Sequence, residues 1–242
     1  MPTEHTVRSY DEELRRLSNT LMQMGGLAES QLAAAIQAVT RRDSGLAGDV
    51  VQTDLRVDQL EAEVDQLVVR ILALRQPVGP DLREIISALK MASDLERIAD
   101  YAANVAKRAI ALNQTPAVRP AFAIPRMGNY AQGMIKDVLD AFVDRNAEKA
   151  IAVWRRDEEL DEMYTSLFRE LLTYMMEDPR NITSATHLLF MAKNVERIGD
   201  HATNIAETIY FLVKGERLNE TRPKGDRSSI AVVVPAAATG AP

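Results

Sequence analysis

Four pairs of carboxylate residues are the part of this 242-residue chain best suited to chemistry, because the two members of each pair stand four positions apart. The pairs are Asp54/Asp58, Glu96/Asp100, Asp157/Asp161 and Glu196/Asp200. In an α-helix, residues four apart lie on the same face, so both carboxylates of a pair point the same way. Like charges at this spacing destabilise an isolated helix by a few tenths of a kcal/mol. We therefore expect a cation to lie against the pairs.

A cation site built from oxygen ligands is one explanation for the pairs. Carboxylates without cysteine and with almost no histidine suit hard cations such as Mg²⁺, Ca²⁺, Mn²⁺ or iron, and do not suit structural zinc. Neutralisation within the helix is a second explanation, because Arg97 and Arg197 each stand three residues before the last carboxylate of a pair. Asn104 and Asn204 continue the same helix faces by one turn. A solvated face without any ligand also stays open.

No nucleophilic or oxidase-type active site accompanies the carboxylates. The chain has no cysteine, and it lacks the G-x-S-x-G, G-x-x-x-x-G-K-[ST] and G-x-G-x-x-G motifs. Di-iron bundle enzymes need Glu-x-x-His motifs, but neither Glu96 nor Glu196 is followed by a histidine at that spacing. We therefore expect a protein that is not an enzyme, with a carboxylate-bridged metalloenzyme as the less favoured alternative.

The pairs belong to a duplicated stretch of sequence. Residues 91–106 read MASDLERIADYAANVA and residues 191–206 read MAKNVERIGDHATNIA, so nine of sixteen positions are identical at an offset of 100. Upstream the offset is 103, as between Asp54 and Asp157. The three extra residues of the first copy fall in the proline-containing segment 75–80, where a loop between helices can vary in length. A period near 100 residues indicates two domain-sized modules.

Apolar residues at three- and four-residue spacing predict three long helices in each module. The predicted helices cover residues 14–40, 46–74 and 81–110 in the first module and 124–143, 147–176 and 181–213 in the second. Asp81 and Asn181 stand at equivalent helix starts, where a side-chain oxygen can cap the helix. Short connections make neighbouring helices antiparallel. The predicted fold is therefore all-α, with two tandem, homologous up-down three-helix bundles.

The predicted domain boundaries follow from the helices. They are 9–113 for the first bundle, 114–123 for a linker, 124–215 for the second bundle and 219–242 for a tail. The tail is polar and then rich in serine, alanine and proline, so we expect it to be disordered. Gly25 and Gly128, which stand at equivalent positions of the two copies, predict a close approach of helices or a kink.

Charge and hydropathy exclude several classes of protein. The net charge is −6, from 35 acidic and 29 basic residues, and this balance does not favour binding to nucleic acid, which depends on Lys and Arg. The polar, acidic N-terminal stretch does not resemble a secretory signal. No uncharged apolar run reaches the roughly 18 residues that a membrane-spanning helix needs. We expect a cytoplasmic protein that is peripheral to the membrane only through its partners.

The motifs resemble those of one family. Each module carries D-x-x-x-D and then E-R-I-[AG]-D-[YH]-A-x-N-[VI]-A, the second copy as ERIGDHATNIAE at residues 196–207. In these motifs the chain is similar to the PhoU family, regulators associated with the bacterial phosphate-specific ABC transporter, over residues 9–215. The resemblance implies two three-helix bundles in a cytoplasmic homodimer. Ala99 stands where the family usually has glycine, and the tail after Asn219 has no counterpart in the family core.

The resemblance also implies a function, partners and a metal site. It implies repression of the phosphate-starvation response when phosphate is plentiful, and damping of phosphate uptake. The implied partners are a membrane sensor histidine kinase (PhoR-like) and the ATPase subunit of the transporter (PstB-like). It further implies metal clusters of Fe, Zn, Mn or Mg on the four carboxylate pairs. An accessory protein of a different phosphate carrier is the alternative.

Overall fold

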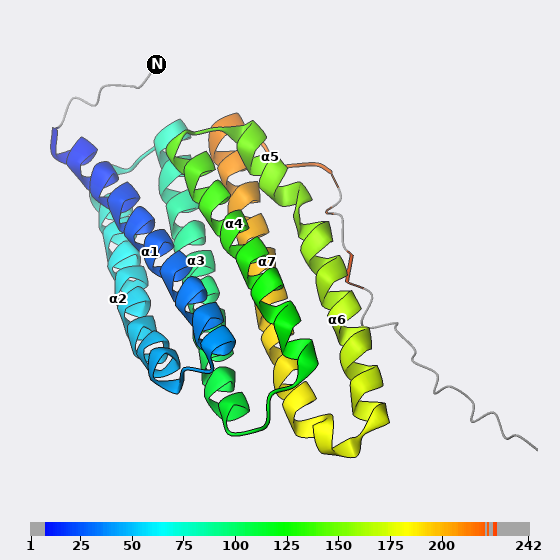
Figure 1. Cartoon of the computed structure of the whole chain (residues 1–242). Coiled ribbons are helices and arrows are strands. Elements are labelled where there is room, and N and C mark those ends of the chain that lie inside the picture. Colours follow the sequence, from blue (N-terminus) through cyan, green and yellow to red (C-terminus); the bar gives the residue numbers. More distant parts are fainter. Residues whose placement is uncertain (1–7, 221, 223–224, 227–242) are drawn as a thin grey trace, which may run out of the picture.

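Long helices make up the fold, as Figure 1 shows for the computed structural model, which describes residues 8–220, 222 and 225–226. The α-helices are α1 (Arg8–Arg41), α2 (Ser44–Arg75), α3 (Gly79–Asn113), α4 (Ala123–Val143), α5 (Ala147–Arg155), α6 (Asp157–Glu177) and α7 (Ile182–Lys214). Short 3₁₀ helices, η1 (Arg119–Phe122) and η2 (Pro179–Asn181), precede α4 and α7. No strand occurs among the described residues. The predicted all-α class is confirmed, with α1–α3 forming the first bundle and α4–α7 the second.

The first connection in each module uses the same turn chemistry in both copies. Arg42 and Arg145 have positive φ angles of 53° and 47°, which few residues other than glycine adopt. The next residue in each copy, Asp43 or Asn146, caps the following helix by accepting hydrogen bonds from two backbone N–H groups. The duplication therefore preserves the turn geometry as well as the helices.

Of the two predicted caps of the third helices, Asp81 is wrong, whereas Asn181 stands at the predicted position without capping through its side chain. The N-cap of α3 is Val78, and Asp81 lies inside the first turn. The helix already begins at Gly79, because Pro80 suits the first turn of a helix. Asn181 does occupy the N-cap of α7, but its side chain makes no capping hydrogen bond. Its amide nitrogen instead donates to the carbonyl oxygen of Tyr174 at 3.4 Å.

The predicted helix over residues 147–176 is in fact two helices, α5 and α6, which are separated at Arg156. Neither glycine nor proline marks this break in the sequence. The guanidinium group of Arg156 pairs with the carboxylate of Asp137 in α4, and its carbon lies 4.7 Å from the ring centroid of Tyr130. Tertiary contacts with α4 therefore accompany the change of direction.

The two bundles pack against each other with approximate two-fold symmetry. A Cβ atom added to Gly25 would overlap the side chain of Leu139, and one added to Gly128 would overlap the side chain of Ile36. Both residues of the second contact are related to those of the first by the offset of 103, so the contact is reciprocal. The close approach predicted for the two glycines is confirmed, and it joins α1 to α4.

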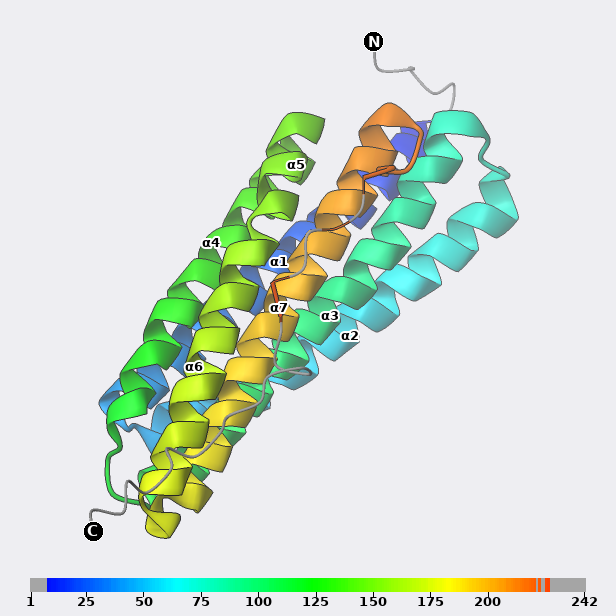
Figure 2. The ribbon, with the colours of Figure 1, turned by 90° about the vertical axis from the view of Figure 1, so that its right-hand side faces the viewer.

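Helices α3 and α7 form the centre of the molecule and carry most of the packing between the bundles (Figure 2). Asp94 of α3 lies 2.8 Å from Nδ1 of His201 and 3.3 Å from the side-chain nitrogen of Asn204, both in α7. The rings of Tyr101 and His201 are 5.6 Å apart. Helices α2 and α6 lie at opposite outer edges (Figure 1), and each packs on the central helix of its own bundle.

After α7 the chain turns back along the second bundle. Gly215 ends α7 with a φ angle of 82°, a conformation that favours glycine. Arg222, Gly225 and Asp226 then contact α6 and α7. The disordered tail over 219–242 stays a prediction, and residues 221, 223–224 and 227–242 lie outside the described part of the chain. None of the helices described here combines the length and apolar character that crossing a bilayer requires.

Candidate functional site

The first group of predicted ligands lies between α2 and α3. We call Asp54, Asp58, Glu61, Glu96 and Asp100 the first carboxylate cluster. Burial raises the pKa of Asp54, and the charges of Asp58 and Asp100 raise it further. Burial also raises the pKa of Glu96. The charge of Arg97 opposes this rise, and the charges of Glu61, Asp100 and Asp58 reinforce it. The structure therefore brings both predicted pairs together and adds Glu61.

Few cations balance the first carboxylate cluster. Arg97 is half exposed and lies 3.4 Å from Glu96 and 3.9 Å from Asp100. Asn104 donates to Oδ1 of Asp100 at 3.3 Å, so both predicted supporting residues contact the cluster. Oδ1 of Asp54 is buried and has no hydrogen-bond partner within the described residues. A buried carboxylate oxygen without a donor fits a hard cation.

The second group of predicted ligands lies between α6 and α7. We call Asp157, Asp161, Glu196 and Asp200 the second carboxylate cluster. The exposed fractions of Asp157, Asp161 and Glu196 are only 1%, 3% and 4%. Burial of ionised carboxylates at this depth is costly unless each has a partner. This cluster therefore needs cations or hydrogen-bond donors more than the first one does.

The protein itself supplies those partners. Arg222 contacts Asp157 and Asp200, with its Nε 2.9 Å from Oδ2 of Asp157 and its Nη2 2.6 Å from Oδ1 of Asp200. The backbone N–H groups of Gly225 and Asp226 donate to Oδ2 of Asp161 at 2.9 and 3.1 Å. The second carboxylate cluster is therefore balanced largely by residues from beyond α7.

Lys193 supplies the second cation of this cluster. Its Nζ lies 2.8 Å from Oε1 of Glu196 and 3.0 Å from Oδ2 of Asp226. Burial raises the pKa of Glu196 to about 7 despite the hydrogen bond from Lys193. The other oxygen of Glu196, Oε2, is buried and has no hydrogen-bond partner within the described residues.

The two remaining supporting residues do not face the second carboxylate cluster. The guanidinium carbon of Arg197 lies 5.6 Å from the ring centroid of Tyr101 in α3. Asn204 donates to Asp94 across the contact between the bundles. The counterparts of Arg97 and Asn104 therefore contribute to the packing of α7 on α3.

The two clusters fit a metal ion to different degrees. Across the described residues, no three His, Cys, Asp or Glu side chains are arranged closely enough to hold a metal as they stand. The first cluster combines several carboxylates with an unpartnered oxygen, and oxygen donors of this kind are those that hard cations take. The second cluster does not fit a metal while Arg222 and Lys193 occupy its carboxylates.

Three residues that take part in the two clusters were missed by reasoning from the sequence, namely Glu61, Lys193 and Arg222. Comparison of the two copies does not mark Glu61 or Lys193, because neither residue recurs in the other copy. Lys193 stands where the first copy has Ser93, and Tyr164 stands where it has Glu61. Arg222 has no counterpart in the first copy, because it lies beyond the duplicated stretch, so no sequence signal marks it.

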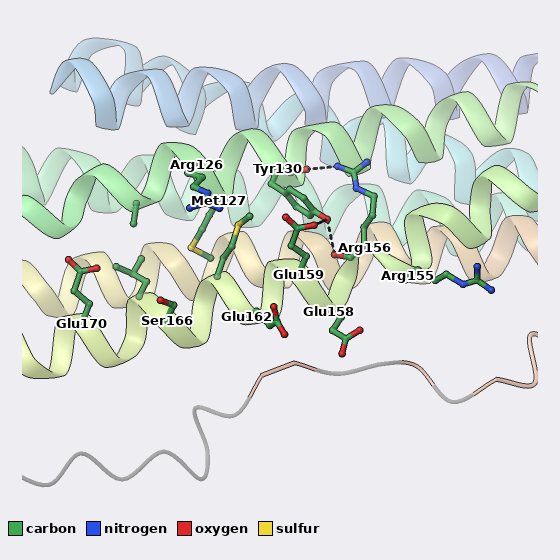
Figure 3. Close-up of a pocket in the computed structure, with 13 residues that line it drawn as sticks. Arg126, Met127, Tyr130, Arg155, Arg156, Glu158, Glu159, Glu162, Ser166 and Glu170 are labelled. Carbon is green, nitrogen blue, oxygen red and sulfur yellow. Dashed lines mark hydrogen bonds between the residues drawn. The ribbon is translucent and has the colours of Figure 1, made fainter.

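A charged groove of about 900 Å³ lies between α4 and α6 (Figure 3). Arginines from α4, from the end of α5 and from the α5–α6 junction line it together with glutamates of α6; these residues are Arg126, Arg155, Arg156, Glu158, Glu159, Glu162 and Glu170. The hydroxyl of Tyr130 donates to Oε2 of Glu159 at 2.8 Å. No member of either carboxylate cluster lines the groove. Its open, mixed-charge walls suit contact with a charged protein surface.

Comparisons with known proteins agree with this architecture. The model of the PhoU domain matches residues 21–109 and 124–209. A phosphate-specific transport system accessory protein PhoU homolog of Caulobacter vibrioides is 54% identical over 225 residues, which cover 93% of this chain and 98% of that protein. The homolog of Rhizobium meliloti is 47% identical over 95% of this chain and 97% of its own length.

Solved structures give the same result for the fold. The crystal structure of PhoU from Pseudomonas aeruginosa matches with a TM-score of 0.83 and 43% identity, covering 86% of this chain and all of that one. The crystal structure of the phosphate transport system regulatory protein PhoU from Streptococcus pneumoniae matches with a TM-score of 0.81 and 30% identity, covering 87% of this chain and all of the other.

Proposed function

The chain belongs to the PhoU family, and on that premise we propose that it is an accessory protein that restrains a phosphate-specific transport system. In this role it lowers phosphate uptake and represses the phosphate-starvation response while phosphate is plentiful. The observation that carries the proposal is the 54% identity to a named accessory protein across nearly the whole length of both chains. The relatives are named as transport accessories, not as enzymes, and we propose no catalytic step.

We propose that the protein acts by contact with two partners, the transporter's ATPase subunit and a membrane sensor histidine kinase. The mixed-charge groove between α4 and α6 supports this, because complementary charges steer association and select partners. A homodimer presenting two such grooves is part of the proposal. Variants that reverse the groove charge, Glu162→Lys and Glu170→Lys, should weaken binding to one partner. Asp49→Lys, on the exposed surface of α2, is the matched control.

We further propose that the first carboxylate cluster holds a divalent or iron-type cation. Asp54, Asp58, Glu96 and Asp100 would be its ligands, with Fe, Zn, Mn and Mg as the candidates. The unpartnered oxygen of Asp54 supports this assignment. A bound cation would neutralise the like charges and so stabilise the packing of α2 on α3.

A genetic experiment tests the proposed function directly. The gene is deleted in its host and replaced by the wild-type copy or by the groove variants, and a phosphate-starvation reporter is measured in phosphate-rich medium. We expect the reporter to be active in the deletion strain and silent again with the wild-type copy. A reporter that stays silent without the gene would overturn the proposed repression. Phosphate uptake measured in the same strains tests restraint of the transporter separately.

A further inference from the structure

The two carboxylate clusters obtain their positive charge in different ways. In the first copy, burial raises the pKa of Asp54, and the nearby charge of Lys107 in α3 opposes this rise. The corresponding residue in the second copy is Glu207, so the second copy has no cationic residue at the position equivalent to Lys107. Arg222 lies near Glu207 and pairs with Asp157, the counterpart of Asp54. A residue from outside the repeat therefore takes the place of a lysine within it.

Arg222 is largely buried and contacts carboxylates of two helices. Its side chain is only 17% exposed, and the same guanidinium group contacts Asp157 of α6 and Asp200 of α7. Gly225 and Asp226, which follow Arg222 in the chain, contact the same two helices. Arginine suits this position because its planar guanidinium group donates several hydrogen bonds in fixed directions and stays ionised. Arg222 therefore connects two helices through their carboxylates, which is the geometric role of a bridging cation.

A second observation shows that the cluster is not fully satisfied by these partners. Glu196 is 4% exposed, and its Oε2 has no hydrogen-bond partner within the described residues. Lys193 occupies only the other oxygen of Glu196 and lies 4.8 Å from the ring centroid of Tyr164. The cluster thus retains an acceptor that a small cation could use.

We propose that the second carboxylate cluster is a binding site for the chain's own Arg222, and that a divalent cation enters it only by displacing Arg222 from Asp157 and Asp200. A guanidinium group and a metal ion placed on the same carboxylates repel each other, so the two compete for the cluster. The apparent affinity for metal equals the intrinsic affinity multiplied by the fraction of molecules in which Arg222 has left the cluster. Arg222 lies outside the two stretches matched by the PhoU domain model, so the repeated domain itself does not supply this cation. The inference does not depend on the proposed role in phosphate uptake.

A metal titration tests the competition. The full-length chain carrying Asp54→Asn and Glu96→Gln serves as the background, because the first carboxylate cluster is then disabled. Mn²⁺ is titrated into this protein, and free Mn²⁺ is followed by electron paramagnetic resonance. Adding Arg222→Gln should lower the dissociation constant by about tenfold or more, because a competing positive charge is removed from the site. Adding Arg217→Gln, an exposed arginine of the same segment, should leave the constant unchanged.

Two outcomes would overturn the proposal. The first is an equal Mn²⁺ affinity with and without Arg222, and the second is no binding at this cluster even after Arg222→Gln. The conservative variant Arg222→Lys keeps a cation in place, so its Mn²⁺ affinity should stay near that of the background. Circular dichroism of each variant establishes that the helices are intact before titration.

A second readout follows Arg222 itself. The Nε–H group of Arg222 donates to Asp157, so it should give a resolved side-chain resonance in ¹H–¹⁵N spectra of metal-free protein, assigned by its absence in Arg222→Lys. Mg²⁺, added at concentrations that compete with Mn²⁺, should remove this resonance as the arginine becomes solvated. A resonance that stays in place at saturating Mg²⁺ would show that metal and Arg222 bind together, against the proposal.

Discussion

At the scale of single residues, the buried carboxylates decide how stability depends on pH. Burial raises the pKa of Glu196 to about 7, from 4.5 in an unfolded chain. Lys193 opposes this shift, whereas Asp200 and Asp161 reinforce it. The native protein therefore keeps a proton on Glu196 at pH values where the unfolded chain has released it. The stabilisation that this proton provides is complete below pH 4.5 and is lost as the pH rises to about 7.

The first prediction concerns Glu196→Gln. In metal-free buffer, the free energy of unfolding of the wild-type protein should fall by about 3 kcal/mol between pH 4.5 and 7 as Glu196 loses its proton. Glu196→Gln should not show this fall, because a neutral amide does not titrate. Urea denaturation at several pH values measures the slope. Glu170→Gln, on the exposed side of α6, is the matched control and should leave the slope unchanged. A slope that is the same in wild type and Glu196→Gln would contradict the prediction.

The second prediction concerns the pair formed by Asp157 and Arg222. Arg222→Gln should lower the free energy of unfolding by about 2 kcal/mol, because it leaves a buried carboxylate without its cation. Asp157→Asn should cost less in the presence of Arg222→Gln than alone, since the pair is then already broken. A double-mutant cycle by urea denaturation measures this coupling. Additive effects of the two changes would show that the ion pair contributes nothing.

The candidate site was predictable from the sequence only in part. The spacing of four residues placed each carboxylate pair on one helix face, and adjacent helices brought the pairs Asp54/Asp58 and Glu96/Asp100 together. Spacing could not reveal Arg222, because a contact from an extension depends on the path of the chain in space. It also could not tell Asn104 from Asn204, whose neighbours differ because only the latter faces the other bundle.

At the scale of helices, close approach at two glycines fixes how α1 lies against α4. Gly25 faces Leu139, and Gly128 faces Ile36, with no room for a side chain at either glycine. Gly26, the next residue of α1, has no atom within 4 Å of an added Cβ. Alanine substitutions at Gly25 and Gly26 should therefore change the free energy of unfolding in opposite directions.

The third prediction is that Gly25→Ala and Gly128→Ala each lower the free energy of unfolding by about 1–3 kcal/mol through overpacking. Gly26→Ala should raise it by about 0.5–1 kcal/mol, because alanine loses less backbone entropy on forming a helix. Thermal or urea denaturation of the three variants makes the comparison. Equal effects at positions 25 and 26 would exclude the close approach as the cause.

Helix positions were largely predictable because apolar periodicity extends over many turns, but local breaks were not. The change from α5 to α6 at Arg156 occurs without glycine or proline, and Arg156 contacts Tyr130 and Asp137 of another helix there. The cap assigned to Asp81 was wrong for a local reason, since Val78 precedes a helix that already starts at Gly79. Helix boundaries that depend on tertiary contacts or on turn geometry are difficult to predict from the local sequence alone.

At the scale of the whole molecule, the extensive packing of α3 on α7 joins the two bundles. The polar contacts of Asp94 with His201 and Asn204 lie within this packing. Unfolding either bundle alone would expose the apolar faces of both central helices. The two bundles should therefore behave as one cooperative unit, although each has the sequence of a domain.

The fourth prediction is a single transition in differential scanning calorimetry, with a ratio of calorimetric to van't Hoff enthalpy close to one. Gly128→Ala, a change in the second bundle, should shift that whole transition to lower temperature without splitting it. Two resolved transitions in the wild-type protein would show that the bundles unfold independently.

The reciprocal contact of Gly25 with Leu139 and of Gly128 with Ile36 has a consequence for the origin of the chain. Such self-complementary contacts are those by which two identical subunits form a two-fold symmetric dimer. The molecule therefore has the form of a dimer of half-length ancestors whose subunits have become covalently linked. Identical subunits must carry identical sites, but linked ones can diverge, and here one half keeps an open acidic site while the other is closed by an arginine.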